Sequence, residues 1–429
     1  MKVSNHDKLV HCRICKSSKL TKYLDLGDQP PSNSFIFKKD IGSEQKFPLE
    51  VLLCEGCGLS QLSTVVSVEE IFGEYAYRTA SSRALEASFK NLKNRVLDFE
   101  AESSVVSSTL IVDIGCNDGS LLKQFQNTKF DLLGVEPSSA ADAARKNGFT
   151  VEKVFFGKED SEVLLQKYGA AAYLLVTNVL AHVPDIESFM QGVKTWLADD
   201  GVFIVEFPYV IDMVRNLWFD TVYHEHLSYL SITPLKKLFD EIGMKIVAIE
   251  RNEIGGSGPF LRLSAVKSNG SSKLTSTLDL DFFLNLELIF DSKNPASYFP
   301  FSQQVQRLKS VILNQLESWE KEGRKIGAFG APAKGNTLLN YLGLNDSIIQ
   351  EIADNTKEKI GKVSPGSHIS VVDDITFLKH KYDIALLLSW NYLDFFMDNS
   401  EYIKGGGTFY CPFPSPALYR LKNREKNES

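Results

Sequence analysis

The stretch Ser108–Phe125, STLIVDIGCNDGSLLKQF, predicts how the middle of the chain folds. Its apolar run Leu110–Val112 is typical of a buried parallel strand, and the residues from Asp113 onward form a turn into a helix. Gly115 and Gly119 let the backbone of that turn approach a ligand closely. The stretch therefore predicts the first strand, turn and helix of a Rossmann-like nucleotide-binding domain.

The following segment, FDLLGVEPS, predicts a second strand that ends in Glu136. A carboxylate at this point can accept hydrogen bonds from both hydroxyls of a ribose. The pattern DxGxxxG, followed by this acid, favours an S-adenosylmethionine (SAM) pocket over a dinucleotide site, because the GxGxxG fingerprint is missing. Two alternatives stay open: the pocket could bind another Rossmann-type ligand, and Glu136 could be an ordinary surface acid. The residues of the turn expected to face the cofactor are Asp113, Gly115, Asn117 and Gly119.

The sequence around this unit continues the α/β pattern. Apolar residues at three- and four-residue steps over 81–100 predict an amphipathic helix, and residues 171–185 and 201–210 each contain a strand. Residues 244–266 predict an antiparallel hairpin that closes the sheet. Asn178 and His182 follow the strand in 171–185, at the edge where parallel sheets bind ligands. We expect Asn178 in the cofactor site, while His182 alone is as well explained as a core histidine.

The segment FDTVYHEHLSYLS, 219–231, follows the next strand and so lies over the predicted cofactor pocket. It places Tyr223, His224, Glu225 and His226 together in a chain with seven histidines. A histidine can remove a proton from carbon only where a neighbouring ketone acidifies it, a tyrosine can donate to the enolate oxygen, and a carboxylate can orient the imidazole. The cluster indicates C-methylation. A metal site on the two histidines, or a loop of satisfied polar groups, remains an alternative.

Four of the six cysteines form two CxxC pairs, Cys12 with Cys15 and Cys54 with Cys57. Two residues between thiolates let one tight turn present both sulfurs to one ion, and two such turns complete a tetrahedral zinc site. Four thiolates leave no position for water, so we predict a structural zinc ion. The alternative is two unrelated pairs of reduced thiols.

Residues 324–344, RKIGAFGAPAKGNTLLNYLGL, predict a second unit of Rossmann type, which consists of a strand, a glycine-rich turn and a helix. A helix N-terminus that carries Lys334 is a suitable cradle for a diphosphate, and Asn336 can donate from the first turn. Asp354 ends the next predicted strand and could hold a ribose, and Trp390 could stack on a base or pack in the core. A fold that has lost its ligand and serves as a lid is the alternative.

The totals agree with a cytoplasmic enzyme. The chain has 429 residues with a net charge of −7, no basic field for nucleic acid, and no apolar run that could cross a membrane. The first residues, MKVSNHDKLVHC, contain no apolar region of the kind found in secretory signals, so we expect none. The predicted fold class is α/β, with a zinc-binding domain over 1–68, a SAM methyltransferase domain over 69–267 and a second Rossmann-like domain over 268–429. We expect a monomer.

In the order and kind of these motifs, the chain resembles the C-methyltransferases that act on nucleotide-linked 4-keto-deoxyhexoses, namely the tetronitrose and kijanose C-3 methyltransferases and the TylC-type group. The resemblance extends over essentially the whole chain. It rests on the two CxxC pairs and on the segments EYAYRTASS, DIGCNDGSLL, LAHVPD, FDTVYHEHLSYLS, GAFGAPAKGNTLLNYLG and SPGSHIS. FDTVYHEHLSYLS and GAFGAPAKGNTLLNYLG are the most specific of these.

The resemblance implies a role for each site residue. His226 would remove the proton at C-3 of the sugar, Tyr223 would contact the keto oxygen, and Glu225 and His182 would support the site, with Tyr77 lining it. His224 would be turned elsewhere. The substrate would be a dTDP- or GDP-linked 4-keto sugar, held in part by Lys334 and Asn336, with SAM and zinc as cofactors.

The chain departs from the family pattern at Arg78, at Gly258-Pro259 and at Pro332, which puts the substrate in more doubt than the reaction. Two other functions stay open. One is O- or N-methylation in the same fold, and the other is a zinc-containing binding module with an inactive cofactor pocket.

Overall fold

The computed structural model describes residues 6–67, 83–103, 107–253, 258–275 and 279–421. Within these ranges the strands form a two-stranded ladder and three larger sheets. Two of the larger sheets are mostly parallel and alternate with helices, while the third belongs to the cysteine-rich N-terminal region. The α/β fold class predicted from the sequence is confirmed.

The central sheet has seven strands in the order β12-β13-β10-β9-β6-β7-β8. Strands β8, β7, β6, β9 and β10 are parallel, and β13 pairs antiparallel with both β10 and β12. The predicted hairpin therefore closes the sheet, with its second strand inserted next to β10. The bounds are β6 Leu110–Ile114, β7 Asp131–Val135, β8 Thr150–Glu152, β9 Ala171–Thr177, β10 Leu197–Phe207, β12 Met244–Asn252 and β13 Phe260–Lys267.

Helices cover both faces of this sheet because its parallel strands are apolar on both sides. In β9, Tyr173 and Leu175 pack with the apolar stripe of α2 (Arg83–Ser103), whereas Leu174 and Val176 belong to the core on the other face. That second core includes residues of α5 (Lys158–Tyr168), α6 (Ile186–Trp196) and α8 (Ile232–Ile242). The remaining helices here are α3 Ser120–Gln124, α4 Ala140–Lys146 and α7 Val210–Arg215, with the 3-10 turns η3 Leu180–His182 and η4 Phe219–Thr221.

The N-terminal region forms a four-stranded sheet in the order β11-β4-β3-β2. Its strands are β2 Leu20–Gln29, β3 Phe47–Cys54 and β4 Ser60–Leu62, and β1 His6–Lys8 pairs with β5 Thr64–Val66 beside it. Strand β11, Ser228–Tyr229, comes from the methyltransferase region and pairs with β4. The segment 219–231 thus runs directly into the sheet of the zinc domain.

The C-terminal sheet has the order β16-β15-β14-β17-β18-β19, and all pairs except β18–β19 are parallel. This is a doubly wound arrangement whose strand order reverses between β14 and β17. The strands are β14 Ile326–Phe329, β15 Glu351–Ala353, β16 Ser370–Val372, β17 Ile384–Leu387, β18 Phe409–Cys411 and β19 Ala417–Tyr419. The helices are α9 Asp279–Phe290, α10 Phe299–Lys321, α11 Ala333–Leu342, α12 Asp374–His380, α13 Leu393–Asn399 and α14 Glu401–Lys404, with 3-10 turns at η5 Pro295–Ser297 and η6 Trp390–Tyr392. A further 3-10 turn, η1 Lys38–Asp40, lies between β2 and β3 of the N-terminal region.

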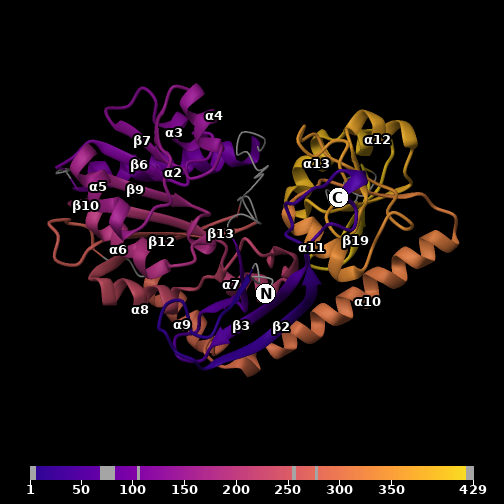
Figure 1. Ribbon diagram of the computed structural model, residues 1–429, viewed down its shortest axis with the longest axis horizontal. Helices are drawn as coiled ribbons and strands as arrows, with labels where there is room; N and C mark the ends of the chain where they lie inside the picture. The colour runs from indigo at the N-terminus through magenta and orange to yellow at the C-terminus, as the bar shows by residue number, and fades with distance from the viewer. Residues whose placement is uncertain (1–5, 68–82, 104–106, 254–257, 276–278, 422–429) are drawn as a thin grey trace, which may run out of the picture.

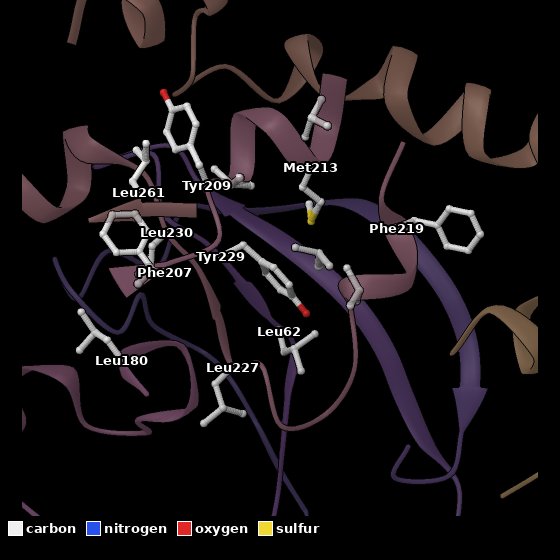
Figure 2. Packing of buried hydrophobic residues seen from close by; sticks show 14 of the residues in the cluster. Leu62, Leu180, Phe207, Tyr209, Met213, Phe219, Leu227, Tyr229, Leu230 and Leu261 are labelled. Carbon is white, nitrogen blue, oxygen red and sulfur yellow. The ribbon is translucent and has the colours of Figure 1, made fainter. Parts of the chain in front are cut away.

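The two α/β lobes stand side by side, and the zinc domain lies below and between them (Figure 1). The long helix α10 runs beneath the C-terminal lobe, and its apolar stripe is buried in the main core. Figure 2 shows how the core continues across domains, with Leu62 of β4 beside Leu227 and Tyr229. No helix in the described ranges is both long enough and apolar enough to cross a bilayer.

Candidate active site

One cavity of about 1150 Å³ is shared by all three domains. The methyltransferase lobe contributes the edge of β6, β7 and β9, the C-terminal lobe contributes the edge of β14, β15 and β17, and the zinc domain contributes Asn33. Both edges are carboxyl ends of parallel strands, where α/β sheets bind ligands. The residues from the segment 219–231 that line the cavity are Tyr223, Glu225 and His226.

The carboxylate of Glu136 is held in place by two backbone N–H groups. Its Oε2 accepts the N–H of Asn117 at 3.0 Å and its Oε1 accepts the N–H of Ser138 at 2.9 Å. Each carboxylate oxygen has a further lone pair, so both oxygens can still accept from a ligand hydroxyl. The acid predicted for a ribose is therefore held in place at the cavity wall.

The turn after β6 has the conformation that its glycines require. Gly115 has φ +80°, and a Cβ there would lie 2.3 Å from Cγ2 of Val179. Gly119 does not line the cavity; it lies over Phe149, whose ring a Cβ would meet at 2.6 Å. Asn117 and Asn178 both line the cavity with positive φ. Gly119 therefore shapes the turn rather than contacting the cavity.

Asp113 supplies a buried acceptor at the cavity. Burial, together with the negative charges of Glu136 and Glu206, raises the pKa of Asp113 to about 8. Its Oδ1 is buried and has no hydrogen-bond partner among the described residues. A ligand that brings a cation or an ammonium donor would satisfy this oxygen, so the residues present fit SAM, whose α-ammonium and sulfonium groups are cationic.

His226 is held in one tautomer. Its Nδ1 lies 2.9 Å from the carbonyl of Thr221, which can only accept, so Nδ1 carries the proton. Its Nε2 is then an acceptor and takes the hydroxyl of Tyr223 at 2.7 Å. Burial, with the neighbouring His182, keeps the pKa of His226 well below its usual value. The ring is therefore a neutral base. Both His226 and the tyrosine whose hydroxyl bonds to Nε2 line the cavity.

His182 and Glu225 complete this part of the wall. The ring of His182 meets that of His226 edge-on with centroids 4.9 Å apart, and burial lowers the pKa of His182 to about 4. Burial raises the pKa of Glu225 to about 7, although its Oε1 accepts from Asn33 Nδ2 at 2.9 Å. The other oxygen of Glu225 is buried without a hydrogen-bond partner among the described residues. Asn33 was missed in the sequence because no motif marks it.

The ring of His224 points away from the cavity, as the resemblance implied. Its Nε2 lies 3.2 Å from the carbonyl of Phe47 in the zinc domain, and it does not line the cavity. The four cysteines are the one group of metal-ligand side chains found close together in the described ranges. The metal site considered for His224 and His226 is therefore not formed. Tyr77 lies outside the described residues.

The cavity is lined by two sheet edges: the cofactor edge, at the carboxyl ends of β6, β7 and β9, and a second edge, at the carboxyl ends of β14, β15 and β17 in the C-terminal lobe. The second edge repeats the backbone geometry of the cofactor edge. Gly330 has φ +82° and donates to the carbonyl of Ala353, the last residue of β15, as Gly115 donates to Val135 at the end of β7. Asp354 then accepts the N–H of Ala331 at 2.7 Å and that of Thr356 at 2.8 Å. This is the pair of contacts that Glu136 makes with Asn117 and Ser138. Asp354 is thus placed like Glu136 in the first lobe.

The second edge differs from the first in carrying buried cations. Lys334 and Lys359 both line the cavity, and burial lowers the pKa of each, for Lys334 to about 8. Lys359 donates to the carbonyl of Ala331 at 2.8 Å. Asn336, by contrast, does not line the cavity; its Nδ2 donates to the carbonyl of Ser32 at 2.6 Å. Of the two residues predicted to bind substrate, the structure brings only Lys334 to the cavity.

The N-terminal cysteines form one cluster. The four sulfur atoms all lie within 4.8 Å of one another, and the closest pairs are Cys15 with Cys54 at 3.4 Å and Cys12 with Cys57 at 3.6 Å. A tetrahedral ion with Zn–S bonds of about 2.3 Å separates its sulfurs by roughly 3.8 Å. The cluster therefore fits zinc with four thiolate ligands and no open position.

A fold with a SAM-type edge, a base beside it and a four-cysteine knuckle defines a SAM-dependent methyltransferase with a structural zinc domain. Family models agree with this class along the chain: "Putative zinc binding domain" matches residues 12–72, "Methyltransferase domain" matches 72–249, and "C-methyltransferase C-terminal domain" matches 254–414. C-methyltransferase NovU of Streptomyces niveus is 29% identical over 410 residues, which is 95% of this chain and 96% of that protein. These matches support a SAM-dependent C-methyltransferase, and SAM and zinc are its cofactors.

Solved structures add only a distant similarity. Magnesium protoporphyrin IX methyltransferase from Synechocystis PCC 6803 with bound SAM is 16% identical, with a TM-score of 0.32 over 43% of this chain and 80% of that one. The plantazolicin methyltransferase BpumL with S-adenosylhomocysteine is 13% identical, with a TM-score of 0.35 over 44% of this chain and 86% of that one. The assignment as a SAM-dependent C-methyltransferase does not depend on them.

Replacing Glu136 by glutamine should weaken SAM binding roughly tenfold to a hundredfold, since hydrogen bonds to a charged group contribute about 1.5–3 kcal/mol. The amide would also turn an NH₂ toward the N–H of Asn117 or of Ser138. Calorimetric titration with SAM measures this effect. Glu162→Gln, at an exposed position of α5, is the matched control and should bind as the wild type does.

Proposed function

We propose that this protein transfers a methyl group from SAM to C-3 of a nucleotide-linked 4-keto-deoxyhexose by way of an enolate. The observation that carries the proposal is the Nε2 atom of His226, a neutral acceptor locked by the Thr221 carbonyl and lying at the wall of the cavity. A base of this kind is needed where a proton must leave carbon, and a ketone next to that carbon makes the proton acidic enough.

The chain's own residues account for the proton transfer. His226 Nε2 takes the proton from C-3, and the electron pair of the C–H bond moves into the enolate. The hydroxyl of Tyr223 occupies Nε2 in the structure; with substrate present, it would donate to the keto oxygen instead, which frees Nε2 and stabilises the developing negative charge. His182 and Glu225 keep the ring in place. SAM, when bound, supplies an electrophilic methyl group to the carbanion.

The second edge supports a nucleotide as the handle of the substrate. Asp354 repeats the placement of Glu136 and can accept from a nucleoside hydroxyl, while the buried ammonium groups of Lys334 and Lys359 suit an anionic diphosphate. The cofactor edge carries Asp113 and Glu136 instead, which suits a cationic ligand. The charge of each edge therefore matches one of the two ligands: the cofactor edge suits the cationic SAM, and the second edge suits the anionic nucleotide sugar. Either dTDP or GDP would satisfy this chemistry.

The wider predictions from the sequence belong to the same proposal. We propose a cytoplasmic monomer with domains over 1–68, 69–267 and 268–429, which acts on neither nucleic acid nor membrane. The structure contributes the contact of Asn336 with Ser32, which ties the third domain to the first. We still propose Asn336 as a residue that holds substrate, acting through this contact rather than from the cavity wall, and Tyr77 as a residue that lines the site.

The pH dependence of kcat/KM should show no loss from His226 until the pH is well below 6.5. The neutral ring is the active form, and burial lowers its pKa, so protonation begins only at lower pH than for a free histidine. Glu225, with a pKa raised to about 7, can add an ionisation near neutrality. Comparing pH profiles of the wild type and Glu225→Gln separates the two. Asp113, with a pKa raised to about 8, can contribute in the same way, so only an acid limb at or above pH 6.5 that persists both in Glu225→Gln and in Asp113→Asn would contradict a buried neutral base.

Mass spectrometry of reaction mixtures tests the proposal. The protein would be incubated with SAM and with matched dTDP- and GDP-linked sugars that differ only in a 4-keto or 4-hydroxy group. We expect one added methyl group on a keto sugar and none on its hydroxy counterpart, because only the ketone acidifies the neighbouring C–H. Methylation of the hydroxy sugar would instead indicate transfer to oxygen or nitrogen.

A further inference from the structure

The loop that carries the base is held from two sides. On one side it enters the zinc domain, since β11 begins two residues after His226 and pairs with β4. On the other side it contacts the C-terminal lobe at three points. The ring of Phe219 packs on Tyr341, the carbonyl of Val222 accepts from Thr337 Oγ1 at 3.0 Å, and Asp220 contacts Trp390. Residues 219, 220 and 222 thus face the third domain, while their neighbours form the site.

Asp220 is the charged member of these contacts and is fully buried. Its Oδ2 accepts the indole N–H of Trp390 at 2.6 Å, whereas its Oδ1 has no hydrogen-bond partner among the described residues. A buried carboxylate is costly unless it is compensated. The compensation comes from the other lobe, because the positive charge of Lys334 acts on Asp220.

Lys334 links this carboxylate to the cavity. Its ammonium lies 4.0 Å from the centre of the Trp390 ring, donates to Oδ1 of Asn391, and lines the cavity at the start of α11. Trp390 itself does not line the cavity; it stacks on Trp218 with ring centroids 5.2 Å apart. The cluster of Asp220, Trp390, Lys334 and Asn391 therefore joins the two lobes directly behind the catalytic loop.

The neighbour of Asp220 in the chain is the residue that sets the tautomer of His226. Thr221 provides the carbonyl that accepts from Nδ1. A displacement of Asp220 would move this carbonyl away from His226. The proton would then no longer be held on Nδ1, and the ring could adopt either tautomer. We propose that Asp220 is a positioning residue, which through Trp390 and Lys334 holds the Thr221 carbonyl against His226 and so keeps Nε2 available as the base. This inference rests on the proposed function for its kinetic part only.

The first test needs no substrate. In protein labelled with ¹⁵N-histidine, the two ring nitrogens of His226 should have the well-separated chemical shifts of a fixed Nδ1–H tautomer. In Asp220→Ala and in Trp390→Phe these shifts should move toward those of a tautomer mixture. The double variant should show little further change, because each substitution removes one partner of the same hydrogen bond. Trp319→Phe, in the same lobe but packed on Tyr410, is the control and should leave His226 unchanged.

Kinetics give the second test, with a substrate that the wild type methylates. Asp220→Ala should lower kcat roughly tenfold to a hundredfold, the range expected for a hydrogen bond to a charged group, without raising KM for the nucleotide sugar. A shift of His226 toward mixed tautomers together with this kcat loss supports the proposal.

Two results would overturn the proposal: an unchanged tautomer in Asp220→Ala, or a raised KM at unchanged kcat, which would assign Asp220 to substrate binding. If the wild type methylates no keto sugar, the proposed function fails, while the tautomer measurement still decides the role of Asp220.

Discussion

Replacing His226 by alanine should lower methyl transfer by roughly a hundredfold to ten-thousandfold, the range by which a positioned general base contributes. The side chain that remains cannot accept a proton, and Tyr223 loses the acceptor of its hydroxyl. SAM binding should be retained, because Glu136 and Asn117 form the cofactor edge without His226. Steady-state kinetics and calorimetric titration of SAM on the same preparation separate the two effects.

The second histidine of the motif provides a matched control. In His224→Gln the amide can still donate to the carbonyl of Phe47, so the contact with the zinc domain is kept. Since His224 does not line the cavity, its loss should change turnover little compared with the loss of His226. Equal effects of the two substitutions, with both proteins folded, would contradict the assignment of the base.

Removal of zinc should abolish turnover even though the ion lies in a different domain from the cofactor edge. Structural zinc contributes on the order of 10–16 kcal/mol in isolated zinc-finger peptides, so the knuckle should not stay folded without it. Strand β4 begins three residues after Cys57 and pairs with β11, and Asn33 of the same domain donates to Glu225. Both contacts with the catalytic loop would be lost.

Cys54→Ala tests this expectation, with metal analysis, thermal melting and turnover measured together. We expect a loss of bound zinc, a lower melting temperature and at least a hundredfold loss of activity, as for a missing general base. Cys411→Ala, which removes a buried thiol from the C-terminal sheet, should keep its zinc. A zinc-free protein with wild-type turnover would show that the knuckle does not support the site.

Local patterns in the sequence were sufficient for the fold. The apolar run before Asp113, the glycine at 115 and the acid at 136 each follow from backbone geometry within one strand–turn–helix unit. The same reasoning placed Gly330 and Asp354 in the second lobe, and the spacing of the cysteines gave the zinc cluster. The short strand β8 was not named, because three residues carry too little periodicity.

The contacts between domains could not be read in this way. Asn33 and Glu225 are 192 positions apart, and Asp220 and Trp390 are 170 apart. No period or motif relates such positions, since their proximity depends on how three domains pack. For the same reason Asn336 was expected at the cavity, whereas its side chain is used between domains. The sequence indicated which side chains are chemically competent, but the packing determines which of them meet.

The most direct test of the central claim is nuclear magnetic resonance of the reaction in heavy water, with a nucleotide-linked 4-keto sugar. With S-adenosylhomocysteine in place of SAM, the account predicts that the wild type exchanges the C-3 proton for deuterium and that His226→Ala does not. With SAM, the new methyl carbon should be bonded to C-3. A methyl group on oxygen or nitrogen, with the C-3 proton retained, would contradict C-methylation through an enolate.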